Sequence, residues 1–302
     1  MKTTGELESI WPPRLGDHYQ PEKILARGGF GVVVLATERG TRQRVAIKLL
    51  NREHGDDPQV ELRFLQEANI VAGLTHPHVL TLLDFGIERD QPYMVLPFIE
   101  GASLRERMRS GPLDWRSVTT LARDLASGLA AIHAAQVIHR DLKPENVLVD
   151  ERGRPLITDF GISKAGSSGV RTAAGVILGT PGYIAPEALL EQPATTQSDM
   201  YALGVTLYEL LSGHRPLQRA DPDDPVSTRT RMEEMLAMRD NVPPPIGSRV
   251  HDLPRWLGAL VAELLATDPE ERPTAAMVAE DLAVRLRPRS VEDTVRGVLL
   301  PA

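Results

Sequence analysis

Glycines and a lysine in the first fifty residues have an arrangement that phosphate binding requires. The segment ARGGFGVVV, residues 26–34, lies between two strand-like runs. Glycines there let the backbone approach phosphates that a side chain would keep away, although such a turn is more often an ordinary hairpin. Lys48, in VAIK, ends an apolar strand, where its amine needs a fixed carboxylate or phosphate. The alternative is an edge lysine whose amine reaches solvent.

A carboxylate partner for Lys48 is available in the next segment, FLQEANIVAGL, which contains Glu67. An ion pair between Glu67 and Lys48 would orient the amine toward the α and β phosphates of a nucleotide. One glutamate on a helix is usually solvated, so this pairing depends on the motifs that follow.

Two segments in the middle of the chain carry most of the chemical information. VIHRDLKPENVLVD at 137–150 and LITDFGISK at 156–164 closely resemble the catalytic loop and the metal-binding segment of the protein kinase family. The resemblance continues through GTPGYIAPE at 179–187, SDMYALGVTLYELLSG at 198–213 and DPEERPT at 268–274. It therefore covers about residues 19–288, and it implies transfer of the ATP γ-phosphate, with Mg²⁺, to serine or threonine hydroxyls of proteins.

The resemblance assigns a role to each polar residue of these motifs. Asp141 accepts or orients the proton of the substrate hydroxyl, and Lys143 stabilises charge on the transferring phosphate. Asn146 and Asp159 hold magnesium, because this cation selects hard oxygen donors. Thr180 bonds Asp141 and Lys143 through its hydroxyl, a pairing typical of the serine/threonine branch of the family. The predicted catalytic set is Asp141, Lys143, Lys48, Glu67, Asn146 and Thr180.

The same resemblance predicts a nucleotide site made of apolar side chains around adenine and a glycine-rich turn over the phosphates. Leu96 controls access behind the adenine, and residues 97–101 form a hinge. The predicted nucleotide-binding residues are Leu25, Ala26, Gly28, Gly29, Phe30, Gly31, Val33, Ala46, Lys48, Leu96, Pro97, Ile99, Leu148 and Asp159.

Two of these residues depart from the family's pattern. Pro97 stands at the first hinge position, where the adenine amino group needs only a carbonyl, and proline retains its carbonyl. Ala26 stands where the glycine-rich loop usually opens with glycine. Alanine there costs about 1 kcal/mol if the position requires a positive φ, and almost nothing if the backbone is extended.

A loop from Ile162 to about Tyr183 contains several hydroxyl residues, and Arg140 directly precedes Asp141. In this family such an arginine commonly receives a phosphate from this activation loop. Thr172 is the predicted site of autophosphorylation, since a phosphate can order a loop by pairing with arginine. The alternative is that Thr172 is a solvated loop residue.

Other polar residues of the motifs are interpreted as structural. His139 could be read as a general base, but in the family's pattern this side chain is part of the loop's framework. Glu187 and Arg272 match a buried ion pair of the family's large lobe, and Asp199 matches a helix aspartate that braces the catalytic loop.

Composition excludes several classes of protein. The 34 Lys and Arg residues against 41 Asp and Glu residues give a net charge of −7, which is the wrong sign for binding a nucleic-acid backbone. With no cysteine there can be no disulfide framework and no thiolate metal site. No stretch approaches the roughly 18 apolar residues of a membrane span, so we expect a cytoplasmic protein whose partners are protein substrates and ATP.

The elements that must position these residues form an α+β, two-lobed pattern. Short runs rich in Val, Ile and Leu, with one stretch of helical period around 58–73, predict a small antiparallel sheet with one helix over 19–98. From 102 to 288 the pattern is mostly helical, interrupted by the hairpin NVLV and PLIT. Residues 1–18 are expected to be a flexible arm, and 289–302 a short tail.

Two other functions are compatible with such a fold. A nucleotide-binding pseudokinase that acts as a scaffold is disfavoured because Lys48, Glu67, Asp141, Asn146 and Asp159 are all present. A phosphotransferase for small molecules is disfavoured because those enzymes lack the LKPEN and APE segments that this chain contains.

Overall fold

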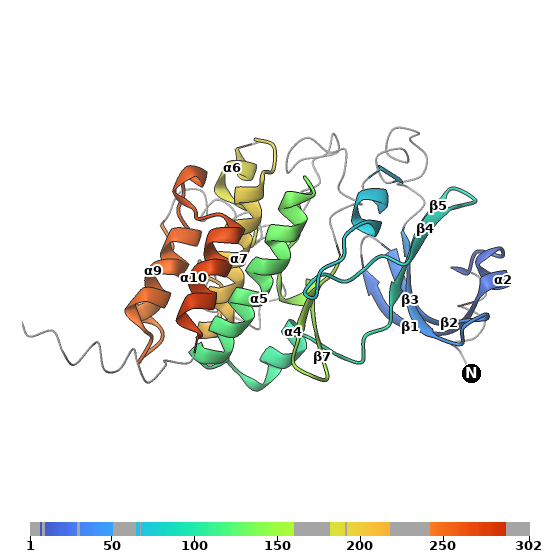
Figure 1. Cartoon of the computed structure of the whole chain (residues 1–302), viewed down its shortest axis with the longest axis horizontal. Helices are drawn as coiled ribbons and strands as arrows, with labels where there is room; N and C mark the ends of the chain where they lie inside the picture. The colour runs from blue at the N-terminus through green and yellow to red at the C-terminus, as the bar shows by residue number, and fades with distance from the viewer. Residues whose placement is uncertain are drawn as a thin grey trace, which may run out of the picture.

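A computed structural model describes residues 7, 10–28, 31–50, 65–66, 68–159, 182–190, 192–217 and 242–287. Strands β1 to β5 gather at one end of the molecule, and the long helices α5, α7, α9 and α10 gather at the other (Figure 1). The predicted two-lobed α+β architecture, with a small antiparallel sheet and a larger helical lobe, is confirmed. Among the residues that the structure describes, no helix has the length and apolar character needed to cross a bilayer.

The small lobe is built on five antiparallel strands in the order β1-β2-β3-β5-β4. The strands are β1 (Tyr19–Gly28), β2 (Gly31–Glu38), β3 (Arg44–Leu50), β4 (Asp84–Glu88) and β5 (Gln91–Pro97). Along β3, Val45, Ile47 and Leu49 are buried on one face of the sheet. Because side chains alternate along a strand, Ala46 and Lys48 share the other face. The register of β3 therefore decides which residues face the predicted nucleotide.

The predicted helix of the small lobe is present where the structure describes its expected range, and residues 58–64 and 67 lie outside the described residues. Residues 65–66 and 68–72 are helical. Ala68 and Val71 are fully buried and join the core cluster that continues into the large lobe.

The N-terminal segment does not behave as the predicted flexible arm. Leu7 and Leu15 are buried among apolar residues of β2, β3 and β5, and α2 (Leu15–His18) leads directly into β1. The carboxylate of Glu88 accepts hydrogen bonds from the backbone N–H groups of Arg14, at 2.7 Å, and Leu15, at 3.0 Å. The prediction of a flexible arm ending at residue 18 is wrong for residues 10–18, because leucines spaced along a polar segment cover the outer face of the sheet.

A second sheet, of three antiparallel strands, carries the central motifs. It consists of β6 (Gly101–Ser103), β7 (Val147–Asp150) and β8 (Pro155–Ile157), and β7 pairs with β8 as the predicted hairpin. In an antiparallel pair the start of one strand lies beside the end of the other. Accordingly, the N–H of Thr158, just after β8, donates to the carbonyl of Asn146, just before β7, at 3.0 Å.

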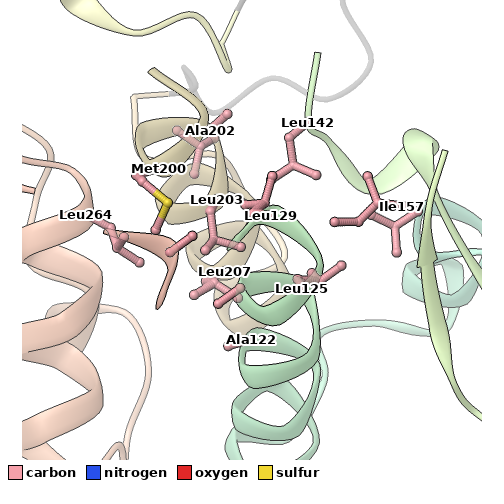
Figure 2. Packing of buried hydrophobic residues seen from close by; sticks show 14 of the residues in the cluster. Ala122, Leu125, Leu129, Leu142, Ile157, Met200, Ala202, Leu203, Leu207 and Leu264 are labelled. Atoms are coloured by element: carbon pink, nitrogen blue, oxygen red, sulfur yellow. The ribbon is translucent and has the colours of Figure 1, made fainter. Parts of the chain in front are cut away.

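The large lobe is organised around α7 (Thr196–Ser212), in which every residue from Asp199 to Leu211 is buried. Its leucines pack against Leu125 and Leu129 of α5 (Trp115–Ala134) and against Leu264 (Figure 2). Asp114 accepts hydrogen bonds from the first N–H groups of α5 and so forms its N-cap. The other α-helices in the described part of this lobe are α4 (Leu104–Arg107), α6 (Pro186–Leu189), α9 (Arg255–Leu264) and α10 (Ala275–Arg285), of which α10 packs on α5.

Candidate active site

The catalytic-loop segment is held in shape by one buried carboxylate. Asp199, which is 1% exposed, accepts hydrogen bonds from the backbone N–H groups of His139 at 2.8 Å and of Arg140 at 2.9 Å. Its Oδ2 atom also lies 2.9 Å from His133 Nε2. Arg140 has a φ of +64°, a left-handed conformation that a non-glycine residue keeps only when its surroundings impose it. The predicted bracing role of Asp199 is confirmed.

His139 lies in this loop and is completely buried. Its Nε2 atom is 2.9 Å from the carbonyl oxygen of Thr158, and its Nδ1 atom accepts a hydrogen bond from the N–H of Asp141 at 3.3 Å. Because both ring nitrogens are used inside the protein, the histidine fastens the loop to the end of β8. This geometry agrees with the structural interpretation.

Three of the predicted catalytic residues come together within this loop. The ε-amine of Lys143 lies 3.0 Å from Oδ2 of Asp141, and the side-chain amide of Asn146 donates to the same oxygen at 3.0 Å. The amide also donates to the Asp141 backbone carbonyl at 2.8 Å. The Asp141 carboxylate is therefore fixed by a cation and an amide, and the amide oxygen of Asn146 is the atom that can bind a cation.

Lys48 contacts a carboxylate that was predicted for a different role. Its ε-amine lies 2.7 Å from Oδ1 of Asp159, the residue predicted to hold magnesium. The predicted partner Glu67 lies outside the described residues. Asp159 has a φ of +58° and follows β8, so the end of this strand presents its carboxylate to the small-lobe sheet.

The predicted adenine-binding residues lie on adjoining strands. Ala46 pairs with Leu96 across β3 and β5, and Val33 pairs with Lys48 across β2 and β3. Leu148, on β7, pairs with Ser103. Val33, Ala46, Leu96 and Leu148 are all half-buried, although the residues beside them in these strands are mostly fully buried. Half-buried apolar side chains at these positions are what a nucleotide base could cover.

The hinge begins where β5 ends, at Pro97. The N–H of Phe98 donates to the carbonyl of Arg44 at 3.3 Å, and the Arg44 guanidinium lies 4.4 Å from the centre of the Phe98 ring. Arg44 also pairs with Glu100 at 3.0 Å. One exposed arginine thus fastens this connection to β3.

The glycine-rich turn contains one position at which only glycine fits. Gly31 has a φ of +146°, and a Cβ atom there would lie 2.0 Å from the carbonyl oxygen of Leu49. Ala26 lies within β1 opposite Val33, in extended backbone, so alanine at this departure from the family pattern carries little cost. Gly28 is the last residue of β1, whereas Gly29 and Phe30 lie outside the described residues.

The predicted ion pair of the large lobe is present. Both guanidinium Nη atoms of Arg272 lie 2.8 Å from the two carboxylate oxygens of Glu187. Burial raises the pKa of Glu187, but the hydrogen bonds and the charge of Arg272, together with hydrogen bonds from a backbone N–H and from Ser198, lower that pKa below its ordinary value, so the carboxyl stays ionised. This pair joins the segment after the activation loop to the chain before α10.

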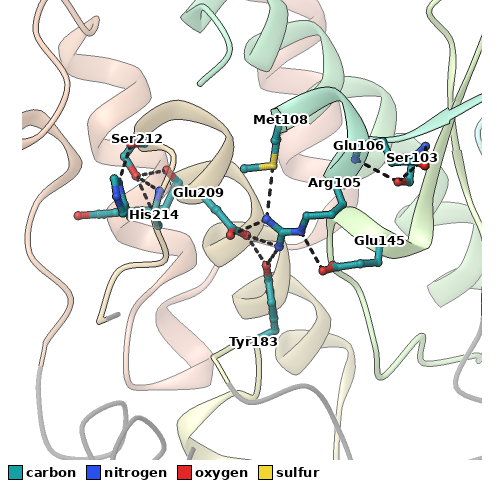
Figure 3. A network of polar contacts seen from close by, with 10 residues as sticks. Ser103, Arg105, Glu106, Met108, Glu145, Tyr183, Glu209, Ser212 and His214 are labelled. Atoms are coloured by element: carbon teal, nitrogen blue, oxygen red, sulfur yellow. Dashed lines mark hydrogen bonds and ion pairs between the residues drawn. The ribbon is translucent and has the colours of Figure 1, made fainter. Parts of the chain in front are cut away.

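A polar cluster around Arg105 was not predicted (Figure 3). Arg105, on α4, contacts Glu145 of the catalytic loop, Tyr183, and Glu209 of α7. Arg105 is one of three arginines within residues 105–109, and nothing in the local sequence distinguishes it from the others. The predicted residues Thr172 and Thr180 lie outside the described residues.

Comparisons with known proteins agree with this geometry. The protein kinase domain family matches residues 19–282. The chain is 36% identical to the serine/threonine-protein kinase PkaB of Streptomyces coelicolor over 91% of its own length and 63% of PkaB. It is also 36% identical to PknK of Mycobacterium tuberculosis, over 85% of this chain and 23% of PknK.

Among solved structures, the PknI kinase domain of Mycobacterium tuberculosis is similar with a TM-score of 0.68 and 25% identity, covering 89% of this chain and 96% of that one. The chain spans less than two thirds of the length of PkaB and about a quarter of PknK. Since the family match extends over most of the chain and includes the motifs around Asp141 and Asp159, the chain belongs to the protein kinase domain family.

Proposed function

We propose that this chain is a serine/threonine protein kinase that transfers the γ-phosphate of ATP to hydroxyl groups of proteins. The observation that carries the proposal is the position of two polar clusters at the paired ends of β7 and β8. One cluster is Asp141 with Lys143 and Asn146, and the other is Lys48 with Asp159. Phosphoryl transfer needs aligned reactants and charge neutralisation more than covalent participation by the protein.

The donor set fits magnesium. Asp159 offers carboxylate oxygens and Asn146 an amide oxygen, and hard oxygen donors suit Mg²⁺, which usually takes its remaining ligands from water and phosphates. Bound there, Mg²⁺ would neutralise charge on the phosphates. Within the described part of the chain, no group of three or more His, Cys, Asp or Glu residues could hold a metal by itself. The phosphates of ATP are therefore part of the proposed metal site.

Each remaining residue has a role that its contacts support. Asp141, held through Oδ2 by Lys143 and Asn146, orients the acceptor hydroxyl and takes its proton. Lys143 places a positive charge next to that carboxylate, where the transferring phosphoryl group must pass. Lys48, on the small lobe, places a positive charge near the phosphates of ATP. Its ion pair with Asp159 aligns the two lobes. Glu67 and Thr180 keep their sequence-based roles as proposals.

The test is phosphate transfer from labelled ATP to a generic basic protein, followed by identification of the phosphorylated amino acid. We expect phosphoserine or phosphothreonine in the presence of Mg²⁺ and none after chelation. Asp141→Asn should lower transfer by on the order of a thousandfold, because the isosteric amide cannot accept the proton. Binding of Mg-ATP by the wild-type chain without transfer would favour the pseudokinase scaffold, and transfer to small alcohols in preference to protein would favour a small-molecule phosphotransferase.

Autophosphorylation is the proposed mode of regulation, with Thr172 as the site. Arg140 lies on the braced catalytic loop with its backbone position fixed by Asp199, so its guanidinium can order a phosphorylated segment. Thr172→Ala should lower turnover of an added substrate several-fold, and mass spectrometry of active enzyme should find phosphate on Thr172. Full activity of phosphatase-treated enzyme would contradict this. Because ATP is supplied inside cells, the cytoplasm is the proposed compartment.

A further inference from the structure

Arg105 connects four segments that are far apart in the sequence (Figure 3). Its two Nη atoms contact the Glu209 carboxylate at 2.9 Å and 3.1 Å, and Nη2 also donates to the Tyr183 hydroxyl at 2.7 Å. Its Nε atom lies 2.8 Å from Oε1 of Glu145. All three nitrogens of the guanidinium are therefore bonded, and the planar fork fits this set of acceptors.

The members of this cluster depend on one another. Glu209 and Tyr183 are 4% and 6% exposed, so a carboxylate and a hydroxyl are held away from solvent with Arg105 as their cation. The Tyr183 hydroxyl donates to Glu209 and accepts from Arg105. Burial raises the pKa of Tyr183 well above its usual value, and the Glu209 charge adds to this, so the hydroxyl keeps its proton. Removing Arg105 would leave the buried Glu209 without this counter-charge.

The cluster joins the catalytic loop, where the proposed function places the acceptor hydroxyl, to the segment that follows Thr180. Glu145 lies between Lys143 and Asn146 in the catalytic-loop motif, and Tyr183 follows the GTPG segment that contains Thr180. Glu209 belongs to α7, the same buried helix that carries Asp199. Arg105 thus fastens the chain at Tyr183 to the helix that also braces the catalytic loop.

We propose that Arg105 is a positioning residue for the protein substrate, which holds the segment around Tyr183 in register with the Asp141 loop. This inference rests on the proposed kinase function. The inference predicts that binding of the protein substrate and binding of ATP can be changed independently. Docking of the protein acceptor depends on Arg105, whereas affinity for ATP depends on residues of β2, β3, β5 and β7, which are not among the polar partners of Arg105 in the described part of the chain.

The test compares Arg105→Ala, Arg105→Lys and Tyr183→Phe with a matched control, Arg109→Ala, whose arginine is exposed in the turn after α4. We expect Arg105→Ala to raise the KM for a protein substrate by about tenfold, because the segment around Tyr183 is no longer held in the position that docks the acceptor, and to leave the KM for ATP within about twofold. Arg105→Lys should give an intermediate KM for the protein substrate, because one ammonium cannot make all the contacts of the planar guanidinium. Tyr183→Phe should change the KM for protein in the same direction, and Arg109→Ala should change neither constant.

Addition of ethylguanidinium to Arg105→Ala should lower the KM for protein again, because the vacated site retains two carboxylates. An unchanged KM for protein in Arg105→Ala, or equal changes in both KM values, would overturn the inference while the wild-type enzyme still shows the proposed activity. Absence of transfer in the wild type would instead refute the proposed function. If Arg105→Ala does not fold, Tyr183→Phe, which retains the ring, decides the question by the same two constants.

Discussion

The ε-amine of Lys48 and the carboxylate of Asp159 lie 2.7 Å apart although 111 residues separate them in the sequence. Lys48 belongs to the small-lobe sheet, and Asp159 follows the hairpin strand β8. The lysine is 16% exposed and the aspartate 33%, so the pair is shielded in part from solvent. This ion pair directly connects the face of β3 that carries Lys48 to the proposed metal-binding segment.

Lys48→Met should lower phosphate transfer by on the order of a hundredfold or more, because a charge that acts on the reacting phosphates is lost. The fold should survive, since methionine has a similar length and packs well at a half-buried position. Activity against a basic protein and a urea unfolding curve measure the two effects. Lys23→Met is the matched control, since Lys23 is an exposed lysine on β1 of the same sheet. Equal activity in the two variants would contradict a role for Lys48.

The Glu187–Arg272 pair should make the stability of the large lobe sensitive to acid. The folded-state pKa of Glu187 lies below its unfolded-state value because of the bonds from Arg272. Its contribution is therefore fully present above the unfolded-state pKa, roughly pH 4, and is lost as the pH falls through the lower folded-state pKa. Glu187→Gln should cost about 3–5 kcal/mol at pH 7, since Arg272 keeps a buried and unbalanced charge.

The difference between wild type and Glu187→Gln should shrink as the pH falls below roughly 4, which denaturant curves at several pH values would measure. The matched control is the exposed pair of Asp281 and Arg285, at 2.7 Å, whose side chains are 46% and 39% exposed. Asp281→Asn should change the free energy of unfolding by less than about 1 kcal/mol. A difference that grows toward acid pH would contradict the assigned sign.

Leu15→Ala should destabilise the small lobe, because Leu15 is buried against the outer face of the sheet. Truncation of a buried leucine costs about 2–5 kcal/mol. The unfolding temperature of Leu15→Ala is compared with that of Arg14→Ala. The latter change removes an exposed neighbouring side chain, while the backbone hydrogen bond of residue 14 to Glu88 remains. The same unfolding temperature for both variants would show that residues 10–18 contribute nothing to the lobe.

The sequence by itself determined the residues that could do chemistry, the hairpin that carries them and the mostly helical character of the large lobe. Asp141 and Asn146 lie in one motif and Asp159 in the next, and an aspartate at position 114 is a residue type suited to the N-cap of α5. These are local features: spacing along a strand or helix decides which side chains share a face or an end. The ion pair of Glu187 and Arg272 was also predicted, through a resemblance that includes both motifs.

For other distant residues, only the tertiary structure decided which of them meet. The Asp159 partner of Lys48, the docking of Leu7 and Leu15 on the sheet, and the contact between Arg105 and Glu209, 104 residues apart, have no signature in local spacing. An arginine in a polar stretch can be solvated or can neutralise a buried carboxylate, and the difference depends on what the fold brings beside it. The residue types determine what chemistry is available, and the packing of the fold determines which distant side chains contact one another.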